Sequence, residues 1–134
     1  PNKLNESIGM GMYGNIENSY NGHDFINYVK KQMDIKHIRH SKILNKRIKK
    51  VAVLGGSGSF GINNAIEKKI DCYITSDLKY HDFFKANNKI LLLDIGHYES
   101  EKFTKELIYN YLLKKIPKFA CIIANTNTNP VNYY

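Results

Sequence analysis

The chain of 134 residues lacks tryptophan and has only two cysteines, three prolines and two arginines. Cys72 and Cys121 stand far apart with no CxxC pair, which excludes a zinc ribbon or a disulfide framework. Both lie in apolar runs, so we predict buried free thiols and a protein of the reducing cytoplasm. No apolar run approaches the roughly 20 residues that a membrane-spanning helix needs, so we expect no membrane partner.

The scarcity of arginine contrasts with a formal net charge of +8, because 18 of the 20 basic residues are lysines. Such a charge makes nucleic acid a candidate partner. Arginine, however, is the usual residue for bidentate contacts with phosphate and guanine. The basic run from Lys42 to Lys50 also has no interleaved aromatic side chains on which bases could stack. We predict a solvated connector there, and nucleic acid stays an alternative that the sequence does not favour.

The length suits one domain with a real core, and 43% hydrophobic and 24% charged residues are typical of globular proteins. From residue 51 onward, short apolar runs alternate with segments of helical periodicity. They predict strands at 51–54, 72–75, 90–95 and 119–124, and helices at 60–69, 80–86 and 97–115. This alternation predicts an α/β fold, with a layered, largely parallel sheet flanked by helices.

The amino-terminal third is less regular. Residues 1–22 are rich in glycine and asparagine and are predicted to form loops or short edge strands. Apolar residues at helical spacing predict a helix from His23 to Met33, with Asn21 or Asp24 near its start. Residues 35–39 are a candidate short strand.

Open parallel sheets bind ligands beyond the carboxyl ends of their strands. Three polar segments of this chain occupy such positions, at 55–59, 75–81 and 94–101. The first, Gly55–Ser59, is either a tight turn or a cradle for an anion. It lacks the GK[ST] of a P-loop, and its GxGxxG pattern has no clear acidic partner. A small nucleotide-binding domain therefore stays open as one interpretation.

The second segment is dense in titratable side chains, since Asp77, Lys79, His81 and Asp82 fall within six residues. Strand-end positions with such a density are candidates for chemistry. A solvated loop in which Asp77 caps the following helix is the competing interpretation.

The third segment carries the sharpest pattern. His97 and Glu101 are four residues apart at the start of a predicted helix, so their side chains share one face. An imidazole and a carboxylate placed in this way can bind divalent ions, although a complete site typically needs at least three protein ligands. The alternative is an ordinary surface hydrogen bond between the two side chains.

Four motifs in order resemble the carboxyl-terminal part of the NIF-three-like family. They are GGSGS at 55–59, TSDLKYHD at 75–82, GHYESE at 96–101 and NTNP at 127–130. The resemblance extends over roughly Gly9 to Tyr134. Members of the family are ring-forming hexamers with dinuclear metal centres and are often named GTP cyclohydrolase 1 type 2.

The resemblance implies a NIF-three-like α/β domain, a homo-hexamer when full length, and two divalent ions per subunit. It implies that His97 and Glu101 are metal ligands and that His81 lines the cavity as a catalytic acid/base or orienting group. The family's other ligands, adjacent histidines and an aspartate, lie in its amino-terminal half. No adjacent histidine pair exists here, so we expect residues 1–134 to be the carboxyl-terminal part, with a half-site.

The function implied by the resemblance is that of a metal-dependent hydrolase, similar to GTP cyclohydrolase 1 type 2. Its substrate would be a nucleotide or a related phosphorylated small molecule. The ligand types do not choose between Zn, Mn, Fe and Co. The alternative function is a non-catalytic scaffold or interaction protein that binds nucleic acid or a protein partner through its basic surface.

Overall fold

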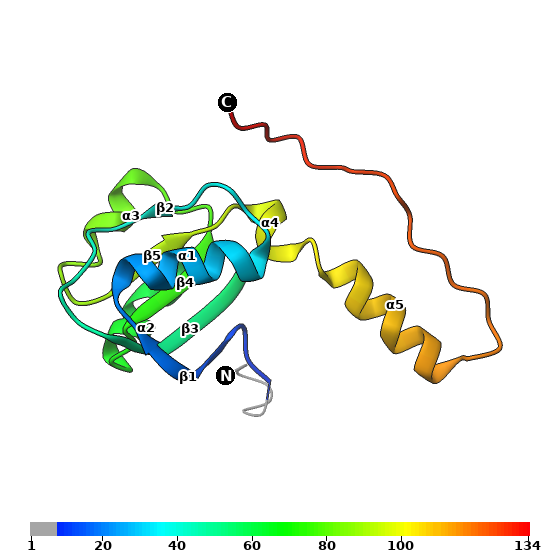
Figure 1. Cartoon of the computed structure of the whole chain (residues 1–134), viewed down its shortest axis with the longest axis horizontal. Coiled ribbons are helices and arrows are strands. Elements are labelled where there is room, and N and C mark those ends of the chain that lie inside the picture. Colours follow the sequence, from blue (N-terminus) through cyan, green and yellow to red (C-terminus); the bar gives the residue numbers. More distant parts are fainter. Residues whose placement is uncertain (1–7) are drawn as a thin grey trace. The chain divides into compact units, whose positions relative to one another are not determined.

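The computed structural model describes residues 8–134 and contains two units, one up to Ser100 and one over Glu101–Tyr134, which are treated separately below. In the first unit, five strands form one sheet in the order β1-β3-β4-β5-β2 (Figure 1). The strands are β1 (Met12–Tyr20), β2 (Arg39–His40), β3 (Ile48–Ser57), β4 (Cys72–Ser76) and β5 (Leu91–Asp94). The helical elements are α1 (Gly22–Met33), the 3-10 turn η1 (Ser59–Gly61), α2 (Ile62–Glu67) and α3 (Tyr80–Phe84).

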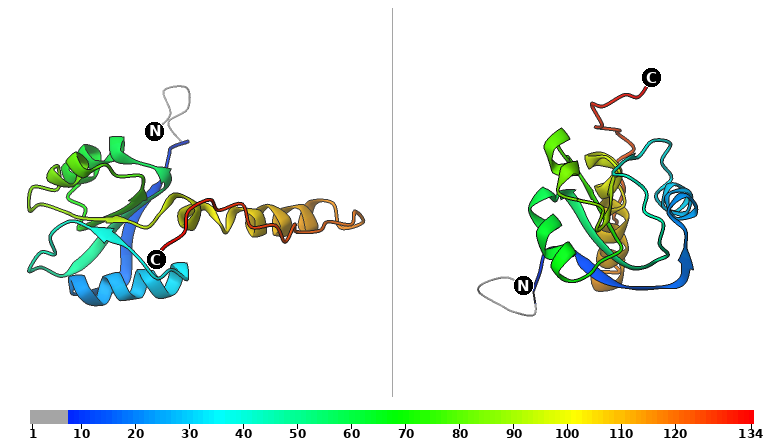
Figure 2. Two further views of the ribbon diagram at one scale, coloured as in Figure 1. Left: turned by 90° about the horizontal axis from the view of Figure 1, so that it is seen from above. Right: turned by 90° about the vertical axis from the view of Figure 1, so that its left-hand side faces the viewer.

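The sheet is mixed. β3, β4 and β5 are parallel to one another, while β1 pairs antiparallel with β3 and β2 pairs antiparallel with β5. Figure 2 shows α1 on one face of the sheet and α2 and α3 on the other. The predicted class, a layered mixed or parallel sheet flanked by helices, is confirmed.

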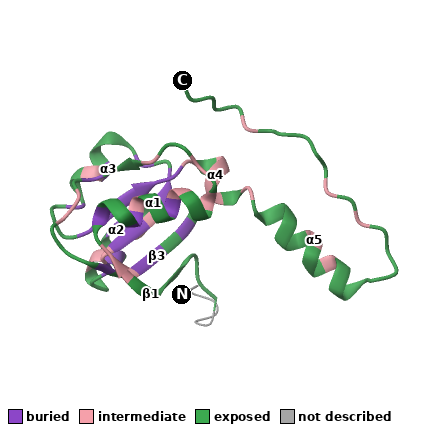
Figure 3. Ribbon diagram, in the orientation of Figure 1, coloured by how far each residue is buried: buried purple, intermediate pink, exposed green. Residues whose placement is uncertain are grey.

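Alternation along the central strands supplies a core on each face, and the buried residues concentrate on these strands (Figure 3). On β4, Tyr73 joins the cluster beneath α2 and α3, while Cys72 joins the cluster beneath α1. Neighbouring strand residues point to opposite faces, so a strand covered on both faces reads as a continuous apolar run. This is why the three parallel strands are visible in the sequence.

The predicted helix at 23–33 is confirmed as α1, which begins one residue earlier. The side chain of Asn21 accepts a hydrogen bond from the backbone N–H of Asp24 at 2.9 Å and so caps the helix. For residues 1–22 we predicted loops or short edge strands. Nine of them form β1, which lies at one edge of the sheet, so the edge-strand alternative is confirmed there and the loop alternative is wrong. Residues 1–7 lie outside the described part of the chain.

The chain from His97 onward differs most from the prediction. The expected helix at 97–115 is divided into α4 (His97–Glu101) and α5 (Thr104–Lys115). The expected strand at 119–124 is wrong: this segment is extended without a strand partner, and the side chain of Ile122 is 92% exposed. Strand preference alone does not form a strand, because a strand also needs a pairing partner. Cys72 is buried as predicted, whereas Cys121 is only partly buried.

No helix among residues 8–134 has the length and apolar character needed to cross a bilayer.

Asp71 joins the start of β4 to the start of β3. Its carboxylate accepts hydrogen bonds from the backbone N–H groups of Lys49 at 3.0 Å and Lys50 at 2.8 Å, and it pairs with Lys46 Nζ at 3.1 Å. Burial raises the pKa of this carboxyl, but the hydrogen bonds from Lys50, Lys49 and Lys46 outweigh burial. The pKa of Asp71 therefore lies below its ordinary value of 3.8.

A lowered pKa predicts acid sensitivity at this position. The ionised carboxylate stabilises the fold above its unfolded-state pKa, and the contribution is lost as the pH falls through the folded-state pKa. We expect Asp71→Asn to cost about 1 kcal/mol at neutral pH and to lessen the loss of stability below about pH 5. Urea unfolding of both proteins across this range measures the difference. Parallel pH profiles would contradict the assignment.

Candidate functional site

The three polar segments predicted at the strand ends meet in the structure. Hydrogen bonds between residues distant in sequence join the first segment to the third, and the second segment to the third. These bonds are Gly56 N to Ser100 Oγ (2.9 Å), Leu78 N to Asp94 Oδ2 (2.9 Å) and His97 Nδ1 with Asp77 Oδ2 (2.5 Å). We call these six residues the strand-end network. The three segments lie together because parallel strands bring their carboxyl ends to one edge of the sheet.

Asp94, the last residue of β5, is the buried anchor of the strand-end network, with 5% of the residue exposed. Its Oδ2 accepts from Leu78 N, and its Oδ1 accepts from Gly96 N at 3.1 Å. Arg39, on the edge strand β2, pairs with Asp94 and also donates to the carbonyl oxygen of Leu78 at 2.6 Å. One carboxylate therefore ties together the loops that follow β4 and β5.

Asp77, on the loop after β4, and His97, the first residue of α4, form a carboxylate–imidazole pair. Asp77 directly follows β4 with a left-handed φ of 56°, which Asp tolerates better than most residues, and Gly96 before His97 has φ of 88°. The side chains of His97 and Asp77 are 52% and 45% exposed. Both groups are therefore reachable from solvent.

Asp77 does not cap the helix that follows, so that interpretation is wrong. Helix α3 begins at Tyr80, and its amino end is closed by Asp82, whose carboxylate accepts from the backbone N–H of Lys79 at 2.9 Å. Asp82 also pairs with Lys85 at 2.6 Å, and the Lys85 and Lys79 hydrogen bonds lower the pKa of Asp82. The carboxylate of Asp77 instead contacts His97.

His81 lies on α3 and is exposed. Its ring packs edge-on against that of Tyr80, with centroids 5.2 Å apart, and the ring of Phe84 lies 6.2 Å away. His81 takes part in none of the three hydrogen bonds that define the strand-end network. Its role as an acid/base or orienting group stays a prediction.

The glycine-rich segment is explained by close packing. Tyr73 donates its hydroxyl proton to Gly58 O at 2.9 Å, and Thr75 donates to Gly56 O at 3.1 Å. A Cβ on Gly58 would stand 2.0 Å from Thr75 Oγ1. The N–H of Gly56, one candidate donor for an anion, is already bonded to Ser100. These contacts support the tight turn over the anion cradle.

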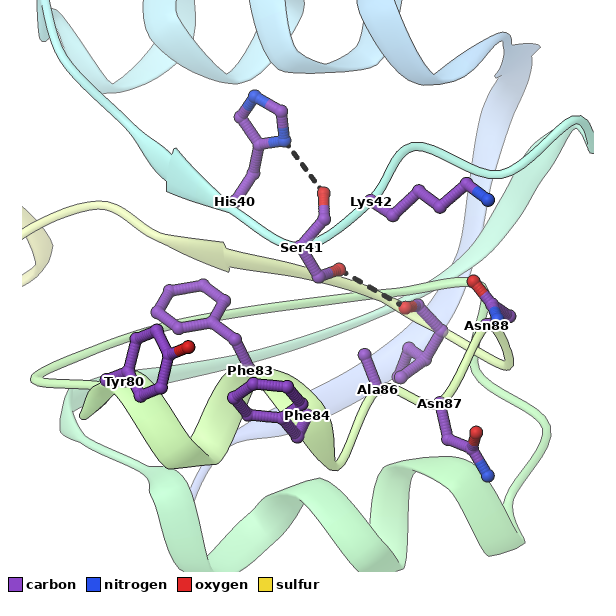
Figure 4. A pocket seen from close by; sticks show the side chains of 10 residues that line it. His40, Ser41, Lys42, Tyr80, Phe83, Phe84, Ala86, Asn87 and Asn88 are labelled. Atoms are coloured by element: carbon purple, nitrogen blue, oxygen red, sulfur yellow. Dashed lines mark hydrogen bonds between the residues drawn. The ribbon is translucent and has the colours of Figure 1, made fainter.

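A cavity of about 520 Å³ lies beside α3, away from the strand-end network. Figure 4 shows Tyr80, Phe83 and Phe84 on one side of it and Ser41 and Lys42 on the other. It is also bounded by Ile90, which precedes β5, so it lies near the amino end of that strand. None of the three predicted site residues lines it.

The donor chemistry of His97 and Glu101 suits part of a metal centre. His97 and Glu101, both on α4, offer an imidazole nitrogen and a carboxylate oxygen, which divalent transition metals accept as ligands. A carboxylate on the second ring nitrogen, as Asp77 provides, is the usual arrangement behind metal-bound histidines. Within residues 8–134, no three His, Cys, Asp or Glu side chains converge on a complete site. The ligand roles of His97 and Glu101 stay a prediction.

Sequence reasoning did not identify Asp94, Ser100 or Arg39 as members of the site, or Asp77 as the partner of His97. One signal was present: Asp94 is the only charged residue in an otherwise apolar strand. A carboxylate at that position needs buried donors. Which donors satisfy it depends on the loops that surround it in space.

Fold and site together define a mixed α/β domain with a polar network at the carboxyl ends of its parallel strands. The family described as Duf34/NIF3 (NGG1p interacting factor 3) matches residues 2–130, and the chain belongs to this family. This confirms the NIF-three-like resemblance seen in the motifs.

Known proteins agree with this placement. A Staphylococcus epidermidis protein named GTP cyclohydrolase 1 type 2 homolog is 34% identical over 136 residues, which cover 98% of this chain and 37% of that protein. A Campylobacter jejuni protein of the same name is 32% identical over 120 residues, covering 89% and 47%. The crystal structure of Staphylococcus aureus protein SA1388 matches with a TM-score of 0.80 and 28% identity, over 94% of this chain and 42% of that one. The chain spans less than half the length of the curated relatives it matches.

Proposed function

We propose that the chain contributes half of the metal centre of a divalent-metal-dependent hydrolase similar to GTP cyclohydrolase 1 type 2. The observation that carries this proposal is the placement of His97. It stands at the carboxyl end of the parallel strands, hydrogen-bonded to Asp77, on the helix that also carries Glu101. The names of the relatives support the same activity.

His97 and Glu101 would be ligands of one or both of two divalent ions, with the remaining ligands outside this chain. Bound ions would supply Lewis acidity and an activated water. The substrate class is a nucleotide or a related phosphorylated small molecule. His81, on the exposed side of α3, would move or orient a proton at the substrate. The buried free thiol of Cys72 suits a reducing cytoplasm.

Assembly belongs to the same proposal. Helix α5 has no buried residue, and the second unit exposes a row of large apolar side chains. They include Phe103, Leu107, Ile108, Tyr111, Ile116, Phe119 and Ile122. An exposed apolar set of this size is typical of a surface that another subunit covers. A homo-oligomer, a hexamer when full length, would cover it.

The basic run provides no second candidate function. Lys46 pairs with Asp71, and Arg47 donates to the backbone carbonyl of Ser19. Lys49 and Lys50 donate through Nζ to the carbonyl oxygens of Glu17, at 2.5 Å, and Lys68, at 2.7 Å. These side chains hold the first strands of the sheet to their neighbours. The scaffold alternative therefore gains no support from this surface.

Metal titration tests the proposed function. Calorimetry of the chain with Zn²⁺, and separately with Mn²⁺, is expected to show weak binding that His97→Ala and Glu101→Gln each abolish. A half-site lacks the further ligands that tight binding needs. His23→Ala, which removes an exposed histidine on α1, is the matched control and should leave the titration unchanged. Binding that survives both ligand substitutions would contradict the assignment, and a tight two-metal site would contradict the half-site.

A further inference from the structure

The contact between Asp77 and His97 has a geometry that an ordinary surface ion pair does not require. The two residues are 20 positions apart, Asp77 on the loop after β4 and His97 at the start of α4. Backbone N–H bonds to Asp94 hold the residue next to each of them, Leu78 and Gly96. Resting on the proposed function, we propose that Asp77 is a positioning residue. Its carboxylate fixes the tautomer and the orientation of the His97 imidazole, so that Nε2 is the atom offered to a divalent cation.

The tautomer follows from donor and acceptor chemistry. An ionised carboxylate has acceptor oxygens only, so the proton in the 2.5 Å contact belongs to His97 Nδ1. In the neutral imidazole, Nε2 then carries the lone pair. A metal ligand must present such a lone pair, and a carboxylate on the opposite nitrogen also raises the basicity of the ligating one.

The orientation follows from how the two loops are held. Asp94 accepts from Leu78 N, next to Asp77, and from Gly96 N, next to His97. Ser100 receives the N–H of Gly56 and donates its own proton to the carbonyl oxygen of His97 at 2.8 Å. The peptide units next to the pair are therefore anchored to Asp94 at the end of β5 and to Gly56 near the end of β3. The hydrogen bond between Asp77 and His97 then fixes how their two side chains face each other.

The role differs from a contribution to stability. Both side chains are about half exposed, and ion pairs in that setting stabilise a fold little. Removal of the carboxylate should therefore change the chemistry of His97 while the midpoint of urea unfolding stays at its wild-type value. A purely structural contact would show the reverse.

The test uses two variants that suit the left-handed backbone of Asp77. Asp77→Gly removes the carboxylate at a φ that glycine adopts freely, and Asp77→Asn keeps the shape without the charge. ¹⁵N NMR of the metal-free chain should show the Nδ1–H tautomer of His97 in the wild type. We expect a mixture of both tautomers in Asp77→Gly and an intermediate population in Asp77→Asn. The Zn²⁺ affinity should fall about 10- to 100-fold in Asp77→Gly.

Asp24→Asn, which removes an exposed carboxylate from α1, is the matched control and should leave both readouts unchanged. An unchanged His97 tautomer in Asp77→Gly would overturn the inference. So would a Zn²⁺ affinity that requires His97 but is unaffected by Asp77→Gly. If the wild-type chain binds no metal, the proposed function fails, and the tautomer measurement still decides whether Asp77 positions His97.

Discussion

Replacement of Gly58 by alanine is expected to destabilise the fold by about 3 kcal/mol, measured as the free energy of unfolding in urea. The added Cβ would stand 2.0 Å from Thr75 Oγ1, 2.7 Å from Tyr73 Oη and 3.0 Å from Leu54 Cδ2. Gly58 has φ of −123°, so the cost comes from crowding and not from a backbone conformation that alanine avoids.

The neighbours of Gly58 cannot move aside without further loss. Thr75 and Tyr73 are buried, and their hydroxyl groups are bonded to the carbonyl oxygens of Gly56 and Gly58. Displacing them would leave buried polar groups without partners, which costs about 1–3 kcal/mol for each group. Because of this crowding, a bulky residue at position 58 would disturb the fold itself. Such a variant therefore could not show whether the glycine segment binds a nucleotide.

Gly14→Ala is the matched control, because a Cβ at Gly14 on β1 meets no atom within 4 Å. It should leave the urea midpoint unchanged or raise it slightly, since alanine suits a strand better than glycine does. Equal midpoints for the two alanine variants would show that the loop after β3 relaxes freely, contrary to our reading of its packing.

Asp94→Asn is the second substitution with a large expected effect, a loss of about 3 kcal/mol in the free energy of unfolding. Both carboxylate oxygens accept backbone hydrogen bonds, from Leu78 N and Gly96 N. An amide of the same shape must turn an NH₂ group toward one of these donors, so a buried N–H loses its acceptor. The ionised oxygen that also receives Arg39 is lost as well.

A substitution of Arg39 distinguishes the contribution of the ion pair from that of the backbone hydrogen bonds. Its side chain is 62% exposed, so solvent screens the ion pair, and Arg39→Gln should cost less than about 1 kcal/mol. Hydrogen exchange at Leu78 and Gly96 should accelerate strongly in Asp94→Asn and only slightly in Arg39→Gln. Similar losses in the free energy of unfolding for the two variants would show that the ion pair, and not the backbone hydrogen bonds, makes the main contribution of Asp94 to stability.

The parallel core could be predicted because its signals are local. β3, β4 and β5 are covered on both faces by α1 on one side and α2 and α3 on the other, and such strands appear as uninterrupted apolar runs. The polar segments at their ends are equally visible. Parallel strands share one edge of the sheet, and the structure shows that these segments meet there.

The edges of the sheet could not be predicted in the same way. β1 is a nine-residue strand in a stretch whose glycines and asparagines indicate loops or short edge strands without choosing between them, and most of its residues are exposed. The segment 119–124 is apolar enough for a strand and forms none. Strand formation at an edge depends on a partner with free hydrogen-bonding groups, and that partner is fixed by the topology rather than by the strand's own residues.

The sequence by itself determined the family, the parallel core and the two residues of α4 that we propose as ligands, because motif order, apolar runs and an i,i+4 spacing are properties of adjacent residues. Only the tertiary structure decided that Asp77 meets His97 and that Asp94 holds both of their loops. Asp77 and His97 are 20 positions apart, and Asp94 and Leu78 are 16 apart. Gly96, the other partner of Asp94, is only two positions away. These contacts form because the sheet carries separate loops to one edge, which no local pattern records.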